Sequence, residues 1–170
     1  MNIGPISIYL AICAAFCAAP AYAAPGDLFV SVNGAAVNGA GSVMEFDPIT
    51  AAGNTFVPNL SRPRGVAFDS SGNLFVTNTT RNTDGTLQGV LLKFDATGAP
   101  LTFPGPGLIG PSNSFFLEDL KIDNAGNIFV IAQDNPDGPN IGPSTIYKFT
   151  PDGTQSTVGS LPGQSFGLAF

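Results

Sequence analysis

The chain has 170 residues, of which 44% are hydrophobic, with 21 glycines, 15 prolines, no histidine and a net charge of -6. This length and apolar content suit one globular domain with a buried core and argue against a disordered chain. Because only six residues are basic, the protein cannot neutralise many phosphates, which excludes nucleic acid as a partner.

The first 23 residues are predicted to be a secretory signal peptide. An apolar run from Ile6 to Ala19 precedes Pro20 and Ala21-Tyr22-Ala23, a small-x-small cleavage site. The alternative is an uncleaved membrane anchor, but the run is short for a span of about 20 residues. We therefore expect a secreted protein, periplasmic or extracellular, with no membrane contact beyond the signal. Cys13 and Cys17 would leave with that signal, so the mature chain would contain no disulfide.

Three kinds of short apolar segment then recur along the chain. The first kind is Gly26–Val32, Gly72–Asn78 and Gly126–Ala132, spaced by 46 and then 54 residues. The second kind is Val43–Asp47, Leu91–Asp95 and Ile146–Thr150, and the third kind is Gly65–Asp69, Asp119–Asp123 and Gly167–Phe170. Each segment has the length and the flanking turn residues of a β-strand.

The turns between these segments share one chemistry. In Asp69-Ser70-Ser71-Gly72 and Asp123-Asn124-Ala125-Gly126, the aspartate can accept a bond from the backbone two residues on, and glycine tolerates positive φ. Repeats of about 40 to 55 residues with four short strands each indicate an all-β fold, a β-propeller of four-stranded antiparallel blades. The alternative is a β-sandwich of about eight to ten strands, which the threefold internal similarity disfavours.

About three blades are expected. Blade 1 covers about 26–60, blade 2 about 63–106 and blade 3 about 115–161, and 165–170 begins a further blade. Blade 1 lacks its first strand. Propellers have roughly four to eight blades, so two interpretations are open. Either the chain is a fragment of a longer reading frame, or its terminal strand completes blade 1 and closes a small ring.

The middle of the chain resembles a known repeat. Pro63–Val76, together with Leu92-Lys93-Phe94-Asp95 and Gly98, resembles an NHL repeat and is similar to the propellers of the SMP-30/gluconolactonase class. The likeness extends over the mature chain in pattern, but only blade 2 matches closely. Blade 3 departs from it, with Leu117-Glu118-Asp119 in place of the Pro-x-Gly lead. The resemblance implies a partial ring of a six-bladed fold.

The SMP-30 resemblance also implies a divalent metal near the central axis. Its ligands would lie just before the glycine of each innermost strand, which corresponds here to Arg64, Glu118 and Phe166. Only Glu118 is a ligand type, and one carboxylate cannot hold a catalytic metal. The alternative interpretation is that Glu118 and Arg64 both face the channel, with Glu118 either paired with Arg64 or hydrated.

Three long polar loops join the second and third strands of the blades, namely Asn33–Ser42, Thr79–Gln88 and Gln133–Ser144. All three are expected on one face of the ring, which makes that face the contact surface. The polar residues expected there are Asn82, Asp84, Asp134, Asn135 and Asn140. Asp134 and Asp137 also carry hard oxygen donors, so a Ca²⁺ or other divalent site competes with the interpretation as plain turns.

These observations predict binding and not catalysis. No histidine exists and no thiol would remain after export, so catalytic triads and histidine-based acid–base chemistry are excluded. We predict no catalytic residue, no cofactor, and a secreted NHL-like module that binds an unknown protein, glycan or small ligand through its loop face. One alternative is a metal-dependent SMP-30-like hydrolase with further ligands beyond Phe170, and another is a cell-surface or envelope adhesin.

Overall fold

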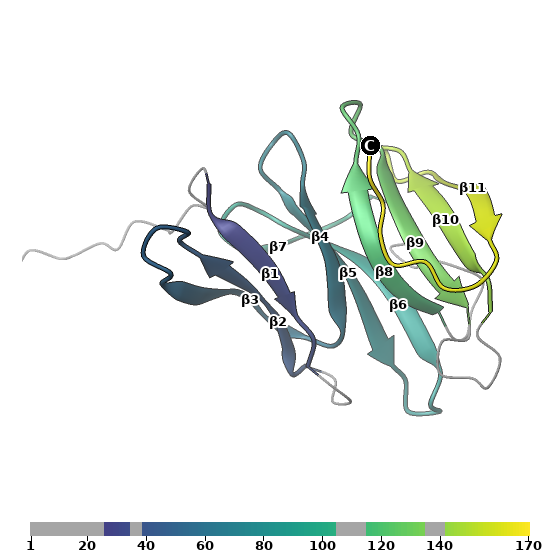
Figure 1. Ribbon diagram of the computed structural model, residues 1–170, viewed down its shortest axis with the longest axis horizontal. Coiled ribbons are helices and arrows are strands. Elements are labelled where there is room, and N and C mark those ends of the chain that lie inside the picture. The colour runs from purple at the N-terminus through teal and green to yellow at the C-terminus, as the bar shows by residue number, and fades with distance from the viewer. Residues whose placement is uncertain (1–25, 35–38, 105–114, 135–141) are drawn as a thin grey trace, which may run out of the picture.

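The computed structural model describes residues 26–34, 39–104, 115–134 and 142–170, and these residues form strands and turns with no helix (Figure 1). The first sheet consists of β1 (Leu28–Val32), β2 (Gly41–Phe46) and β3 (Gly53–Leu60). The second consists of β4 (Pro63–Phe68), β5 (Leu74–Arg81), β6 (Leu87–Phe94) and β7 (Pro100–Leu101). The third consists of β8 (Phe115–Ile122), β9 (Ile128–Asp134), β10 (Ser144–Phe149) and β11 (Gln155–Leu161).

Every neighbouring pair of strands within a sheet is antiparallel and consecutive in the chain, as in the blades of a propeller. The predicted all-β class is therefore confirmed, with blade 1 as a three-stranded sheet and blades 2 and 3 as four-stranded sheets. In the described ranges no helix is long and apolar enough to cross a membrane. The predicted signal peptide lies outside the described residues.

The Asp-x-x-Gly turns have the predicted hydrogen bonds. The Asp69 carboxylate accepts bonds from the backbone N–H groups of Ser71 and Asn73, at 2.9 Å each, and Gly72 has a φ of 80°. The turn at Asp123 repeats this arrangement, with the N–H groups of Ala125 and Asn127 at 2.9 and 2.8 Å. Glycine is needed at the end of each turn because other residues rarely adopt positive φ.

Two hydrophobic clusters fill the two gaps between the sheets. The cluster between blades 1 and 2 contains Val43, Val57, Leu60, Leu74, Val76 and Phe94. The cluster between blades 2 and 3 contains Phe75, Leu91, Leu117, Leu120, Ile128, Val130, Ala132, Tyr147 and Phe149. Blade 2 is therefore buried on both faces, which explains why the run Leu74–Val76 is apolar without alternation.

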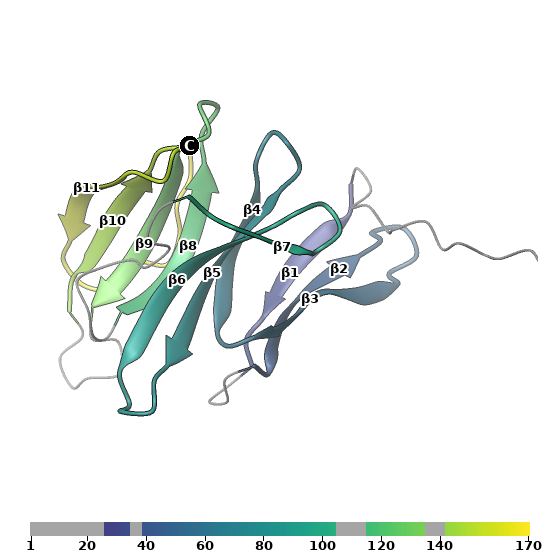
Figure 2. The ribbon, with the colours of Figure 1, turned by 180° about the vertical axis from the view of Figure 1, so that it is seen from behind.

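The sheets are arranged as consecutive blades of a partial propeller and not as the two layers of a sandwich. β4 lies against β1 of the preceding blade, and β8 lies against β4, so each innermost strand contacts the blade before it. Figures 1 and 2 show the three sheets side by side from opposite directions. The described residues form an open arc and no closed ring.

The expected strand at Gly167–Phe170 does not form. Residues 164–170 have no strand assignment and form no ladder with any described strand. The segment returns from β11 and runs beside β8 (Figure 1), where the Leu168 N–H donates to Asp119 Oδ2 at 2.9 Å. The interpretation that this strand completes blade 1 of its own chain is not what the structure shows, because β1 pairs only with β2 among the described residues.

The first sheet presents an apolar face to solvent. Leu28, Val30 and Val32 are 57%, 39% and 43% exposed, on the face of β1 turned away from blade 2. Met44 and Phe46 of β2 pair with Val30 and Leu28 and so lie on the same face. A sheet face of this composition is normally covered by another layer.

Candidate functional site

The innermost strands carry an ion pair at equivalent positions of their blades. Arg64 of β4 and Glu118 of β8 form a salt bridge, in which the Glu118 side chain is 7% exposed and the Arg64 side chain 33%. The guanidinium groups of Arg64 and Arg62 also lie 4.5 and 5.1 Å from the centre of the Phe116 ring. Glu118 is therefore a buried carboxylate whose charge is balanced by a cation held on an aromatic ring.

The predicted metal ligands do not gather in the described part of the chain. No three acidic, cysteine or histidine side chains lie close enough there to hold an ion. Glu118 is engaged by Arg64, and Phe166 is an exposed apolar residue. Asp134 ends β9, where its backbone pairs with Gly142 and Pro143. Asp137, Asn135 and Asn140 lie outside the described residues.

The loop between β5 and β6 is a compact hairpin turn. Asn82 donates from its side chain to Thr86 Oγ1 at 3.0 Å, and the Asp84 carboxylate accepts bonds from the Thr86 N–H and hydroxyl at 2.9 and 2.6 Å. These bonds lower the pKa of Asp84 below its usual value. Asn82 and Asp84 thus stabilise the turn and hold its exposed surface in one conformation.

The strands that lead into the three long loops all end at the same end of the fold. β1, β5 and β9 run in the same direction and terminate at the lower edge of the view in Figure 1. Near this edge the side chain of Gln133 is fully buried, and its amide has no hydrogen-bond partner among the described residues. A buried amide of this kind is normally completed by water or another polar group, a feature that sequence reasoning missed.

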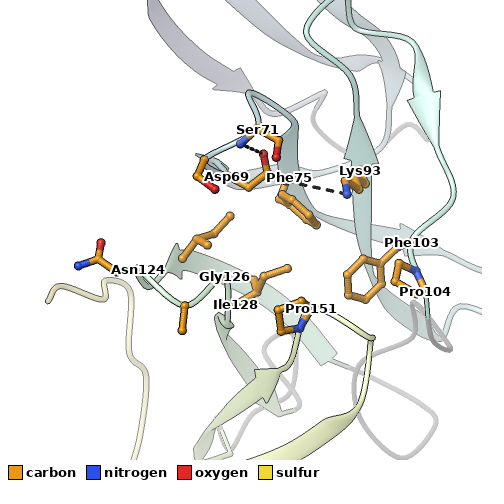
Figure 3. A pocket seen from close by; sticks show the side chains of 13 residues that line it. Asp69, Ser71, Phe75, Lys93, Phe103, Pro104, Asn124, Gly126, Ile128 and Pro151 are labelled. Carbon is orange, nitrogen blue, oxygen red and sulfur yellow. Dashed lines mark hydrogen bonds and ion pairs between the residues drawn. The ribbon is translucent and has the colours of Figure 1, made fainter.

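A pocket of about 280 Å³ opens between blades 2 and 3, next to the turns that follow β4 and β8 (Figure 3). Phe75, Phe103 and Ile128 supply its apolar walls. The Lys93 ammonium lies 3.9 Å from Asp69 Oδ2 and 5.1 Å from the centre of the Phe75 ring. The pocket offers a cation, a carboxylate and aromatic edges, which are groups that can orient a small ligand.

A hydroxyl that joins neighbouring blades was also missed from the sequence. Thr77 Oγ1 of β5 donates to the Glu118 carbonyl at 2.9 Å and accepts a bond from the Gly65 N–H at 2.8 Å. Ser31 of β1 holds the equivalent place, and its hydroxyl donates to the Arg64 carbonyl at 2.5 Å. Alignment of the repeats could have revealed this position, although blade 3 has Ile131 there.

No protein-family model matches this chain, and no curated protein matches it. The likeness to NHL repeats and to SMP-30-class propellers therefore rests on the residues quoted for it in the sequence.

Replacing Glu118 by glutamine is expected to lower the free energy of unfolding by about 1–3 kcal/mol, because the substitution removes a charge-assisted bond to Arg64 in a mostly buried place. The loss should stay in this range because Arg64 is partly exposed and can turn toward water. Urea unfolding of the wild type, E118Q, R64M and the double variant measures the coupling between the two side chains. A zero coupling energy would show that the pair contributes nothing.

Acid is expected to weaken the fold through the turn aspartates. Hydrogen bonds from Thr97 and Asn127 lower the pKa values of Asp95 and Asp123, so the folded state favours their ionised form. That contribution is complete above the unfolded pKa of about 3.9 and is lost as the pH falls through the lower folded value. The thermal midpoint should therefore stay level from about pH 7 to 5 and fall below about pH 4.

The double variant D95N/D123N should have a flatter acid limb in the same titration. Glu45 provides a control of opposite sign. Burial and the nearby Asp27 raise its pKa, so its ionisation disfavours the folded state at neutral pH. E45Q removes this cost, so the thermal midpoint should rise slightly at neutral pH while the fall below about pH 4 stays as in the wild type. A flattening of the acid limb in E45Q equal to that of D95N/D123N would contradict the assignment to the turns.

Proposed function

We propose that this chain is an exported, non-catalytic binding module that contacts a polar ligand through the loops following β1, β5 and β9. The observation that carries this proposal is that these three strands end at the same edge of a rigid three-blade arc. Rigid scaffolds with variable loops at one end are a common arrangement for recognition. The NHL-like pattern of blade 2 also favours this function.

The β5–β6 loop is suited to binding because its conformation is already fixed. Its internal bonds from Asn82 and Thr86 are formed without a ligand, so little conformational entropy is lost on contact. The amide, hydroxyl and carboxylate groups in this and the neighbouring loops can form hydrogen bonds with sugar hydroxyls or a polar protein surface.

The hydrolase alternative receives no support from the described residues. It needs several oxygen ligands around one ion, and Glu118, the one matching position that has a carboxylate, pairs with Arg64. Incubation with gluconolactone and Ca²⁺, Mn²⁺ or Zn²⁺ should therefore give no acid release above that of buffer and metal alone. Metal-dependent hydrolysis of gluconolactone would contradict the proposal of a non-catalytic binding module and favour the hydrolase alternative.

Binding can be tested on a defined glycan array with the exported chain. Because Asn82 and Asp84 hold the β5–β6 loop in shape, N82A/D84A should weaken retention on a bound glycan at least about tenfold. The matched control D95A/T97A removes the same kind of internal bonds from the turn after β6, at the opposite end of the blade, and should bind normally. Equal loss in both variants, or no effect of N82A/D84A, would contradict binding through the loops.

A further inference from the structure

The arc has two incomplete places, one at each end. At the first end, β1 is an edge strand with no innermost strand beside it among the described residues. At the other end, residues 165–170 have the sequence of an innermost strand and pair with no described strand. Blade 1 therefore lacks an innermost strand among the described residues, and residues 165–170 form an unpaired segment with the sequence of one.

The terminal segment is already seated on blade 3 as an innermost strand is seated on the blade before it. Phe170 packs edge-to-face on Phe129, with ring centres 5.3 Å apart and planes at 77°. Phe68 of β4 packs on Phe29 of blade 1 in the same way, at 4.7 Å and 70°. In the repeat, Phe170 corresponds to Phe68 and Phe129 to Phe29.

A second contact has the same repeat relation. Gly65 of β4 lies so close to β8 that an added Cβ would be 2.7 Å from the Leu120 nitrogen. One blade later, Asp119 holds the Gly65 position, and its carboxylate accepts a bond from the N–H of Leu168, which corresponds to Leu120. The terminal segment therefore has the position and the register of the first strand of a further blade.

The sequence of β1 matches that of β5, which pairs with an innermost strand. In blade 2, β4 pairs with β5 so that Val66 is opposite Val76 and Phe68 opposite Leu74. In blade 1, Leu28 and Val30 are the counterparts of Leu74 and Val76, but they are 57% and 39% exposed, whereas Leu74 and Val76 are fully buried. Leu28 and Val30 are exposed because blade 1 has no preceding blade and no innermost strand among the described residues.

We propose that two copies of this chain form a closed six-bladed ring, in which the terminal segment of each copy becomes the innermost strand of blade 1 of the other. Each chain would supply three blades, and each junction would repeat the contact already made between blades 1 and 2. The total lies within the usual range of roughly four to eight blades. The occupant of the exposed face of β1 is thus blade 3 of a second copy.

The repeat fixes the register of this pairing. By analogy with β4 and β5, Leu168 should lie opposite Val30 of the other copy, and Phe170 opposite Leu28. The Ser31 hydroxyl, which donates to the Arg64 carbonyl in its own chain, should accept a bond from the Gly167 N–H of the other copy. The Thr77 hydroxyl already makes both kinds of bond, one within blade 2 and one to blade 3.

Cysteine cross-linking tests both the assembly and the register. In the full chain with Cys13→Ser and Cys17→Ser, no native thiol remains. V30C/L168C should oxidise to a disulfide-linked dimer on a non-reducing gel, and light scattering should give the mass of two chains before oxidation. A mixture of V30C and L168C chains should form the same link, whereas each single variant alone should not.

The matched control is V30C/A169C, which is one residue out of register and places the second thiol on the opposite face of the strand. It should cross-link at least about tenfold less than V30C/L168C. L28C/F170C provides a second in-register pair should V30C/L168C fail to fold.

Three results would overturn the proposal. A monomer by light scattering would show that no second copy covers blade 1. A disulfide within one chain would show closure of a single-chain ring, and a dimer that links equally well through Ala169 would show a different interface.

Discussion

Replacing Phe149 by alanine is expected to lower the free energy of unfolding by about 3–5 kcal/mol, because it removes a whole aromatic ring from the core. Phe149 ends β10 and is fully buried in the cluster between blades 2 and 3. Its ring also meets that of Phe103 edge-to-face at 5.9 Å. The substitution would leave a cavity between two sheets whose contact depends on this packing.

Urea unfolding followed by far-ultraviolet circular dichroism measures this loss. F166A is the matched control, because Phe166 is 65% exposed and its replacement should change the free energy by less than about 0.5 kcal/mol. A loss below about 1 kcal/mol in F149A would show that blades 2 and 3 are not held together by this cluster.

Replacing Thr77 by valine is expected to cost about 2–4 kcal/mol, although the two side chains have nearly the same shape. The change removes the hydroxyl that bonds Gly65 within blade 2 and Glu118 in blade 3, and it leaves a buried N–H and a buried carbonyl without that partner. Each buried group left unsatisfied costs about 1–3 kcal/mol.

Two further variants separate the hydroxyl from the methyl group of Thr77. T77S keeps both hydrogen bonds and should lose only about 1 kcal/mol for the missing methyl. T55V makes the same change at an exposed position of β3 and should be close to neutral. If T77S and T77V unfold at the same urea concentration, the inter-blade hydroxyl has no role in stability.

The turns and strands of this fold could be predicted from the sequence because the same segments recur in all three blades. The Asp-x-x-Gly turns and the strands that they join depend on residues close in the chain, such as Asp69 with Gly72. The burial of Leu74 on a two-sided sheet followed from an apolar run without alternation. These predictions needed no knowledge of how the sheets sit in space.

Features that depend on a distant partner were harder to predict. Residues 167–170 have the sequence of a strand, but a strand forms only where a second strand can pair with its backbone. Here the Leu168 N–H donates to the Asp119 carboxylate and not to the backbone carbonyl of a neighbouring strand. The interaction between Thr77 and Glu118 joins residues 41 positions apart. From the sequence, Glu118 could be either hydrated or paired with Arg64. The structure shows that Glu118 forms a salt bridge with Arg64.

The way β4 and β8 cover the preceding sheets has a consequence for synthesis on the ribosome. The apolar side of each sheet stays open until the next innermost strand has emerged, and β4 follows β3 after a turn of two residues. Blade 1 can therefore begin to dock almost as soon as its last strand is made, in the amino-to-carboxyl order in which domains fold during translation. The outward side of β1 gains no such cover from any later strand among the described residues, so its apolar side chains are still exposed to solvent when β11 has been made.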